Sequence, residues 1–331
     1  MNAVSRSVSY LVSRRQWLAH TSAAAASLAA ATGGLPAFAA APMGGGTAVS
    51  VHRMKLGEFE VTTVLDGFID LPPTVLAGDP AQVKRFLELA GLPAGPIRTA
   101  VNCFLVNTGS KLVMIDCGGA KMLGPNAGRM PAALAQMGIN PAQVDEVYIT
   151  HMHGDHLHGA VTPEGAKVFP NAVLRIAKGD VDYWGSAAVE AAAPENQKGR
   201  FIAAKRAMAA YGDRLQTFEL GAELTPGIRS VPAAGHTPGH SCYMVSSGGA
   251  RLLLLGDAMH VAAVQFPKPE ITVAFDFSQD EARARRAEMF EMAAKDNILI
   301  GAVHLPFPGI GRLRTREGGG YNYEPLGWQM Y

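Results

Sequence analysis

Short segments in which hydrophobic and polar positions alternate recur along the chain, and this period of two is typical of strands with one buried face. The first such segment begins at Lys55 and ends at Asp66-Gly67. Residues 98–107 and 111–116 flank Thr108-Gly109-Ser110 and predict an antiparallel hairpin. Apolar runs predict further strands at residues 145–150, 172–176, 228–231, 241–245, 251–255 and 298–303.

Helical segments separate these strands. Residues 130–138, 178–188 and 196–211 have helical patterning, and Ser278-Gln-Asp-Glu281 is a capping box that begins a helix to about Lys295. Strands and helices are therefore mixed in both halves, and no Pro/Ser-rich linker divides them. We expect one α/β domain of packed sheets covered by helices over residues 42–331.

The first 41 residues have a different composition. Their only charged residues are Arg6, Arg14 and Arg15, and an Ala-rich apolar run leads to Ala-Phe38-Ala39. Paired arginines, an apolar run and small residues before a cleavage position are typical of a twin-arginine export signal. A membrane anchor or a disordered leader is the alternative, but the run is short for a spanning helix. We expect a periplasmic or secreted protein without a stable membrane anchor after cleavage.

Charge and cysteine content exclude other classes. Of 29 basic side chains three belong to the leader, so the remaining chain carries 26 against 28 acidic ones. This near balance argues against a nucleic-acid partner. Cys103, Cys117 and Cys242 form no Cys-x-x-Cys pair and lie in apolar stretches. We expect them to be small buried hydrophobic residues, which excludes a scaffold built on disulfides.

Four of the ten histidines lie in the segment His151-Met-His153-Gly-Asp155-His156-Leu-His158, directly after a predicted strand. A single histidine on an apolar face is more often a core residue than a ligand. Grouped imidazoles beside a carboxylate repel one another when protonated, and a divalent cation relieves this. His151 and His153, two apart on an extended segment, can share one ion. Asp155 and His156 follow a glycine and can face a second ion.

Further candidate ligands follow later strands. His236 lies in Gly235-His-Thr-Pro-Gly-His240, Asp257 ends an aliphatic run, and His304 follows the last predicted strand. Strand ends that meet at one edge of an α/β sheet are common positions for sites. His158 and His240 are expected to support the site without binding a metal.

These motifs, in this order from about residue 100 to 304, resemble those of the metallo-β-lactamase superfamily. The segments 148–153, 261–266 and 304–311 resemble methyl parathion hydrolase and its lactonase relatives. The resemblance implies an αββα sandwich of two mixed β-sheets flanked by helices, with a dinuclear metal centre at one edge. It implies that Asp116 supports the metal loop, although Asp116 can equally be a turn residue.

The resemblance also implies the distribution of ligands. One ion takes His151, His153 and His236, the other takes Asp155, His156 and His304, and Asp257 bridges them. Nitrogen and oxygen ligands without thiolate suit Zn²⁺, and Mn²⁺, Co²⁺ or Fe²⁺ remain alternatives. Two ions lower the pKa of a bridging water from 15.7 toward about 7, which produces a hydroxide that attacks a carbonyl or phosphoryl centre. Asp155 and Asp257 are the expected catalytic carboxylates, Asp155 orienting the hydroxide and passing a proton to the leaving group.

The expected substrate pocket rests on alignment with the parathion hydrolase group. Its candidate residues are Trp184, Phe201, His260, Phe275, Leu123 and Leu76. For Phe201, packing between two helices is an equal alternative. The group has an Arg where Leu76 stands, a Phe where Leu123 stands, and aliphatic residues at His260 and Phe275. These departures favour a lactonase or aryl esterase acting on a small neutral ester or lactone over an organophosphate triesterase.

Three other classes share part of the pattern. A β-lactamase with a cysteine ligand lacks the second histidine of the motif, which is His156 here, and has that cysteine where Asp257 stands. Glyoxalase II carries a helical C-terminal substrate domain, whereas only 27 residues follow His304. A non-catalytic metal-binding protein is the alternative outside the enzymes, because ligands alone do not prove turnover. A homodimer is compatible with all of these interpretations.

Overall fold

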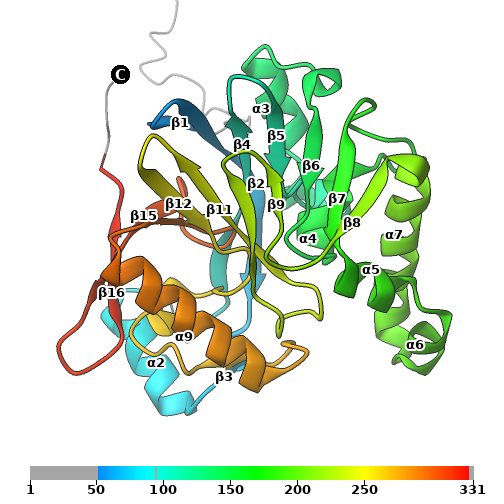
Figure 1. Cartoon of the computed structure of the whole chain (residues 1–331). Coiled ribbons are helices and arrows are strands. Elements are labelled where there is room, and N and C mark those ends of the chain that lie inside the picture. The colour runs from blue at the N-terminus through cyan, green and yellow to red at the C-terminus, as the bar shows by residue number, and fades with distance from the viewer. Residues whose placement is uncertain (1–50, 94, 328–331) are drawn as a thin grey trace, which may run out of the picture. The chain divides into compact units, whose positions relative to one another are not determined.

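Two large mixed sheets dominate residues 51–93 and 95–327, the part of the chain that the computed structural model describes (Figure 1). The first sheet has the strand order β1-β2-β4-β5-β6-β7-β8. Its strands from β5 to β8 are parallel and the others antiparallel. Their bounds are β1 (Val51–Leu56), β2 (Phe59–Leu71), β4 (Ile97–Asn107), β5 (Leu112–Ile115), β6 (Glu146–Tyr148), β7 (Val173–Ala177) and β8 (Leu215–Phe218).

The second sheet has the order β16-β15-β14-β12-β11-β10-β9, and only β12 and β14 pair in parallel. A separate two-stranded ladder joins β3 and β13. The bounds are β3 (Leu76–Ala77), β9 (Glu223–Thr225), β10 (Ile228–Pro232), β11 (Ser241–Ser247), β12 (Ala250–Leu254), β13 (Thr272–Val273), β14 (Leu299–Gly301), β15 (Ile310–Thr315) and β16 (Tyr321–Pro325).

Helices connect and cover these strands. The longest are α7 (Glu195–Tyr211) and α9 (Gln279–Lys295), and Ser278 caps α9 by accepting a hydrogen bond from the Glu281 amide. This is one half of the predicted capping box, because the Ser278 amide donates to the Gly235 carbonyl and not to the Glu281 side chain. The other α-helices are α2 (Pro80–Leu89), α3 (Met130–Gln136), α4 (Gly154–Leu157), α5 (Lys178–Gly185), α6 (Ala187–Ala192) and α8 (Ala262–Gln265). Short 3₁₀ turns are η1 (Pro73–Val75), η2 (Ala120–Asn126), η3 (Pro141–Gln143), η4 (His158–Ala160) and η5 (Gly212–Arg214).

Alternation along the strands builds four layers. In β4, Phe104 and Val106 belong to the apolar cluster between the two sheets, whereas Cys103 and Leu105 belong to the cluster under α3 and α7. In the second sheet, Leu252 and Leu254 face the first sheet while Leu253 packs in the cluster under α9. Side chains two apart on a strand share a face, so each sheet separates two cores. This arrangement confirms the predicted αββα sandwich.

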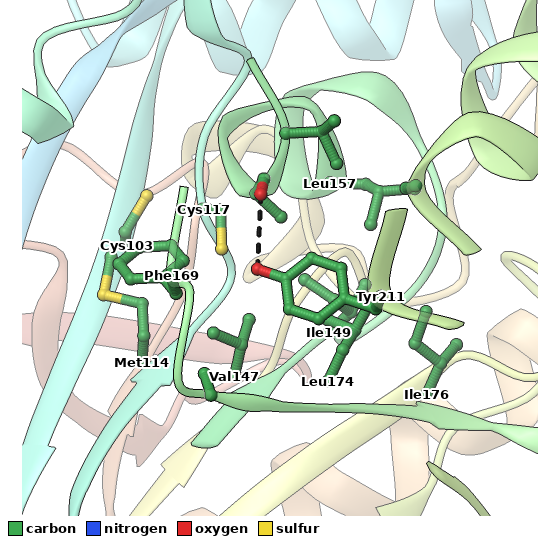
Figure 2. Close-up of a cluster of buried hydrophobic side chains, with 14 of the residues drawn as sticks. Cys103, Met114, Cys117, Val147, Ile149, Leu157, Phe169, Leu174, Ile176 and Tyr211 are labelled. Atoms are coloured by element: carbon green, nitrogen blue, oxygen red, sulfur yellow. Dashed lines mark hydrogen bonds between the residues drawn. The ribbon is translucent and has the colours of Figure 1, made fainter. Parts of the chain in front are cut away.

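The cluster on the helix side of the first sheet contains two of the three cysteines (Figure 2). Cys103 and Cys117 are fully buried and free, as is Cys242 behind the second sheet. Burial raises the pKa of all three thiols well above its usual value, so they are protonated at neutral pH. Tyr211, at the end of α7, donates its hydroxyl hydrogen bond to the Ala160 carbonyl at 3.2 Å (Figure 2). The expectation of buried cysteines outside disulfides is confirmed for these residues.

One predicted boundary is wrong. Asp66-Gly67 does not end the strand, because β2 continues to Leu71 with a bulge between Leu65 and Gly67. The Asp66 carboxylate accepts hydrogen bonds from the amides of Gly119, Gly128 and Met130 and so anchors the segment after β5. A Cβ atom at Gly67 would lie 2.1 Å from the Asn126 carbonyl oxygen, so this close approach requires glycine.

The pattern also failed to predict α2, β15 and β16. Helix α2 was missed although Val83, Phe86 and Leu87 follow the helical period and pack in one cluster, and it begins at the Asp79 side chain, which accepts a hydrogen bond from the Ala81 amide. Strand β16 has no buried residue and is paired only with β15.

The described residues belong to one compact unit. The predicted export signal, residues 1–41, lies outside the described residues and stays a prediction. Within the described ranges, every helix is too short or too polar to cross a membrane.

A buried carboxylate on β6 gives a test of this packing. Glu146 is 3% exposed and accepts hydrogen bonds from Lys111 and, at 2.5 Å, from Arg175 Nε. Burial raises the pKa of Glu146, but Arg175 and Lys111 outweigh burial and lower it. We expect Glu146→Gln to lower the free energy of unfolding at pH 7 by about 2 kcal/mol, because it leaves two cations without their partner.

The same substitution has a pH signature. A lowered carboxylate pKa stabilises the fold fully above the unfolded pKa, and this contribution is lost as pH falls through the folded pKa. The difference between wild type and Glu146→Gln in urea unfolding should therefore be constant near pH 7 and shrink below about pH 4. Asp70→Asn, which breaks the exposed pair with Arg98, is the control and should leave the midpoint unchanged. A pH-independent difference for Glu146→Gln would contradict the assignment.

Candidate metal centre

The histidine-rich segment follows β6 and is held from two sides. Thr150 donates from its amide and its hydroxyl to Asp116, each at 2.8 Å, and Asp116 follows β5. The Met152 amide donates to Asp180 of α5 at 2.8 Å. The segment then enters α4, whose first residues are Gly154 and Asp155. Two buried carboxylates therefore hold the loop on which four of the predicted site residues lie.

The other three predicted site residues follow strands of the second sheet. His236 follows β10, Asp257 follows β12 and His304 follows β14. Strands β12 and β14 are parallel, and β10 runs in their direction because both β10 and β12 are antiparallel to β11. The three strand ends therefore lie at one edge of the sheet, where the loop after β6 meets them.

The seven side chains form two groups that share Asp257. One group is His151, His153, His236 and Asp257, and the other is Asp155, His156, Asp257 and His304; within each, one ligand atom per residue lies within 4.8 Å of the others.

The two oxygens of Asp257 face different groups. Oδ1 lies 3.1 Å from His156 Nε2 and 3.2 Å from His304 Nε2. Oδ2 lies 3.3 Å from His236 Nε2 and 3.5 Å from His151 Nε2. This is the arrangement required of a carboxylate shared between two cations.

Hydrogen bonds fix the outer nitrogens of three imidazoles. His156 Nδ1 lies 2.8 Å from Asp116 Oδ2, His236 Nδ1 lies 2.7 Å from Asp276 Oδ1, and His304 Nδ1 lies 2.8 Å from the Ala100 carbonyl oxygen. An acceptor at Nδ1 places the proton there and leaves Nε2 free as a ligand atom. All three Nε2 atoms consequently point toward Asp257.

The electrostatics of this cluster suit cations. Burial lowers the pKa of His151. Burial would also lower that of His304, but the carboxylates of Asp257 and Asp155 raise it to about 10. His151 Nε2 and His153 Nδ1 lie only 2.9 Å apart.

Two buried atoms of the cluster lie 3.1 Å apart without forming a hydrogen bond. His156 Nε2 and Asp257 Oδ1 make no hydrogen bond within the described residues. Unpaired buried acceptors are costly, and a divalent ion would satisfy both. The donor set of imidazoles and carboxylates without thiolate fits zinc.

The family of the chain follows from a comparison with family models. Residues 96–300 match the model described as the metallo-beta-lactamase superfamily. The chain belongs to the metallo-β-lactamase superfamily. The resemblance inferred from the motifs is confirmed at this level, and the placement beside methyl parathion hydrolase itself stays a prediction.

Solved structures of this superfamily share the fold. The hydrolase AbOPH is 31% identical with a TM-score of 0.81, covering 86% of this chain and 100% of its own. The dizinc quorum-quenching lactonase AidC, solved with a product, is 27% identical with a TM-score of 0.79, covering 85% and 99%. A probable metal-dependent hydrolase from Staphylococcus aureus is 19% identical with a TM-score of 0.69 over 84% and 100%, which supports the fold alone. No curated protein matched the chain.

A cavity of about 310 Å³ opens on the centre of this superfamily member. Three predicted pocket residues, Leu123, His260 and Phe275, line it together with Asp155 and Asp257. Two residues that we did not predict, Ile69 and Leu71 at the end of β2, form another part of its wall. They were missed because the strand was expected to end at Gly67.

The other pocket predictions have different outcomes. Trp184 lines a second cavity of about 220 Å³, next to His153 and His236. Phe201 lines neither cavity: it is 1% exposed and packs between α7 and α5 against Tyr183 and Trp184, so the alternative of packing between two helices is the correct one. Leu76 is also absent from both walls, because β3 pairs with β13 and packs Leu76 against Val83 and Leu87 of α2.

The residues expected to support the ligands from behind also have different outcomes. Asp116 binds His156 and Thr150, as the resemblance implied, and is not merely a turn residue. His240 lies behind Asp257, whose amide donates to His240 Nε2 at 3.0 Å. His158 lines the cavity instead of lying behind the ligands.

Three supporting residues were not predicted. Asp276 holds His236, and Asp180 accepts from the amides of Met152 and Gly239. Arg286 is fully buried in α9, donates to the carbonyls of Ala258 and Ile271, and lies 3.9 Å from Asp276 Oδ2. Each lies outside the histidine motifs and has a common residue type, so its role depends on packing between distant elements. The one sequence signal for Arg286 is its position: it shares the helical period of the apolar residues Met289 and Phe290, where a charged side chain is uncommon.

The contact between Asp276 and His236 can be tested. We expect Asp276→Asn to weaken zinc binding by roughly 10- to 100-fold, because the imidazole loses its charged acceptor and its fixed orientation. Chelator competition at fixed pH measures the affinity, and circular dichroism verifies the fold. Asp280→Asn removes an exposed carboxylate four residues further on, bound only to Arg283, and should leave the affinity unchanged. Equal zinc affinity in wild type and Asp276→Asn would exclude this role.

Proposed function

We propose that this protein is a dinuclear metal-dependent hydrolase that opens lactones or cleaves aryl esters. The observation that carries the proposal is the position of Asp257, whose two oxygens face separate donor groups at the base of a cavity. A single structural ion would need only one such group.

Bound ions would supply activation of a bridging water and polarisation of the substrate oxygen. Asp155 is suited to proton transfer, because it is the cluster carboxylate that reaches the cavity with 16% of its side chain exposed. Its Oδ2 lies 3.4 Å from His304 Nε2. Burial would raise the pKa of Asp155, but the imidazoles of His156 and His304 outweigh burial and lower it, so the carboxylate is ionised at neutral pH and can accept a hydrogen bond that orients a water in the cavity. The proton released when that water reacts can pass along the carboxylate to the leaving oxygen.

The walls of the cavity favour an uncharged, apolar substrate. Ile69, Leu71, Leu123 and Phe275 supply hydrophobic surface, and His260 is a polar group near the reacting position. The relative AidC, a quorum-quenching lactonase solved with an acyl-homoserine product, supports a lactone. We therefore place lactones and aryl esters before phosphotriesters.

Metal content and substrate preference test this function together. Replete protein should hold about two zinc ions per chain, and chelation should abolish hydrolysis until zinc is restored. We expect dihydrocoumarin, N-hexanoyl-homoserine lactone or phenyl acetate to be hydrolysed with a higher kcat/KM than methyl paraoxon. Fewer than two ions, or faster turnover of the phosphotriester than of every lactone and ester, would contradict the proposal.

His260 provides a sharper probe of the substrate class. Its Nε2 lies 3.1 Å from Asp257 Oδ2, its ring stacks on His304, and neither of its nitrogens has a hydrogen-bond partner in the described chain. We expect it to bind a polar atom of a lactone. His260→Leu should lower kcat/KM for lactones by roughly tenfold, the value of one hydrogen bond, and raise that for methyl paraoxon.

The control for this variant is His52→Leu, which removes a partly exposed histidine on β1 outside both cavities. It should leave all four activities unchanged. If His260→Leu also changes none of them, His260 does not contact the substrate.

A further inference from the structure

The second cavity, of about 220 Å³, adjoins the first. His153, Arg200 and Phe275 line both, so these three residues form the boundary between them. A substrate held at the metal centre can therefore extend past this boundary toward α5 and α7. The second cavity is available for the part of the substrate that leaves or remains bound during hydrolysis.

Aromatic rings form much of the second cavity. Tyr183, Trp184, Phe275 and Phe277 line it, and the ring centroids of Tyr183 and Phe277 lie 5.3 Å apart in an edge-on arrangement. Phe277 is 60% exposed, so its ring is accessible to a ligand in the cavity. Such walls favour a planar ring over a flexible acyl chain, because ring faces and edges pack against one another.

Arg200 supplies the positive charge at this boundary, and the Asp276 carboxylate, 8% exposed and bound to His236, lines the second cavity as well. Arg200 is the only lysine or arginine among the residues that line the two cavities, and its side chain has no hydrogen bond or ion pair within the described chain. Lys198, on the same helix, is paired with Glu195 at 2.7 Å. A guanidinium at the boundary of an aromatic cavity presents its donors in the geometry that binds a carboxylate through two parallel hydrogen bonds.

We propose that Arg200 selects esters whose aryl leaving group carries a carboxylate, with the ring in the second cavity and the carboxylate on the guanidinium. This rests on the proposed hydrolase function: the reacting ester group at the candidate centre is uncharged, and the negative charge lies only on the leaving group in the second cavity. Arg200 contacts the substrate at a distance from the reacting carbonyl. It therefore contributes to binding and not to the chemical step.

The test compares 4-acetoxybenzoate with its neutral analogue 4-acetoxybenzamide. Hydrolysis of the first consumes one water and yields acetate and 4-hydroxybenzoate. Arg200→Gln should lower kcat/KM for 4-acetoxybenzoate by about 10- to 100-fold, mainly through KM, and that for 4-acetoxybenzamide by less than about twofold. Arg200→Lys keeps the charge without the planar fork and should recover part of the loss. Lys198→Gln removes one positive charge from the same helix outside both cavities and should change neither substrate.

Calorimetry separates this inference from the proposed function. Binding of 4-hydroxybenzoate and 4-hydroxybenzamide is measured with metal-free and zinc-loaded protein. We expect Arg200→Gln to weaken only the carboxylate, by tenfold or more, in both forms. If wild type hydrolyses neither ester while this binding difference persists, the function fails and the anion site stands. Equal losses for both substrates in Arg200→Gln, or no loss for either, would overturn the role of Arg200.

Discussion

The structure depends on one buried negative charge, the carboxylate of Asp257. It is 2% exposed, and four imidazoles from three separate loops approach its oxygens within 3.5 Å, with His260 at 3.1 Å beside them. Burial alone would raise the pKa of Asp257, but the surrounding histidines, His156 first among them, lower it well below its usual range. An ionised carboxylate in such a place needs positive charge around it, so the strand ends that deliver the histidines must meet around Asp257.

The two sheets bring these side chains together because buried hydrogen bonds hold three of the candidate ligands from behind. Asp116 holds His156, Asp276 holds His236, and the Ala100 carbonyl of the first sheet holds His304 of the second. Gly256, directly before Asp257, lets His240 approach the backbone closely: its φ is +51°, and a Cβ atom there would lie 2.7 Å from His240 Nε2. Arg286 extends the support to α9 by binding the carbonyl of Ala258, directly after Asp257. The centre is thus built on strand ends and buried hydrogen bonds, which hold ligand geometry more precisely than free loops.

The proposed division of labour follows from the two cavities. Around the candidate metal centre the cavity wall includes the apolar side chains of Leu123 and Phe275 beside Asp155, which suits a reaction that needs water at one position and excludes it elsewhere. Beyond the boundary at Arg200 the wall combines aromatic rings with the Arg200 guanidinium and the Asp276 carboxylate. A substrate with an uncharged reacting group and an anionic ring would satisfy both environments at once.

The sequence by itself determined the layered α/β fold, the buried cysteines and the candidate ligands, because these depend on local patterns: alternation along strands, capping, and histidines placed directly after apolar runs. Leu123, His260 and Phe275 could also be placed at the cavity by resemblance. Only the tertiary structure decided that Leu76 packs on α2, that Phe201 lies in the core, and that Asp276, Arg286 and Arg200 belong to the site. The reason is physical: these positions acquire their role from the elements packed against them, and the His236 partner of Asp276 and the cavity walls around Arg200 come from segments tens of residues away that leave no periodic or motif signal in the chain.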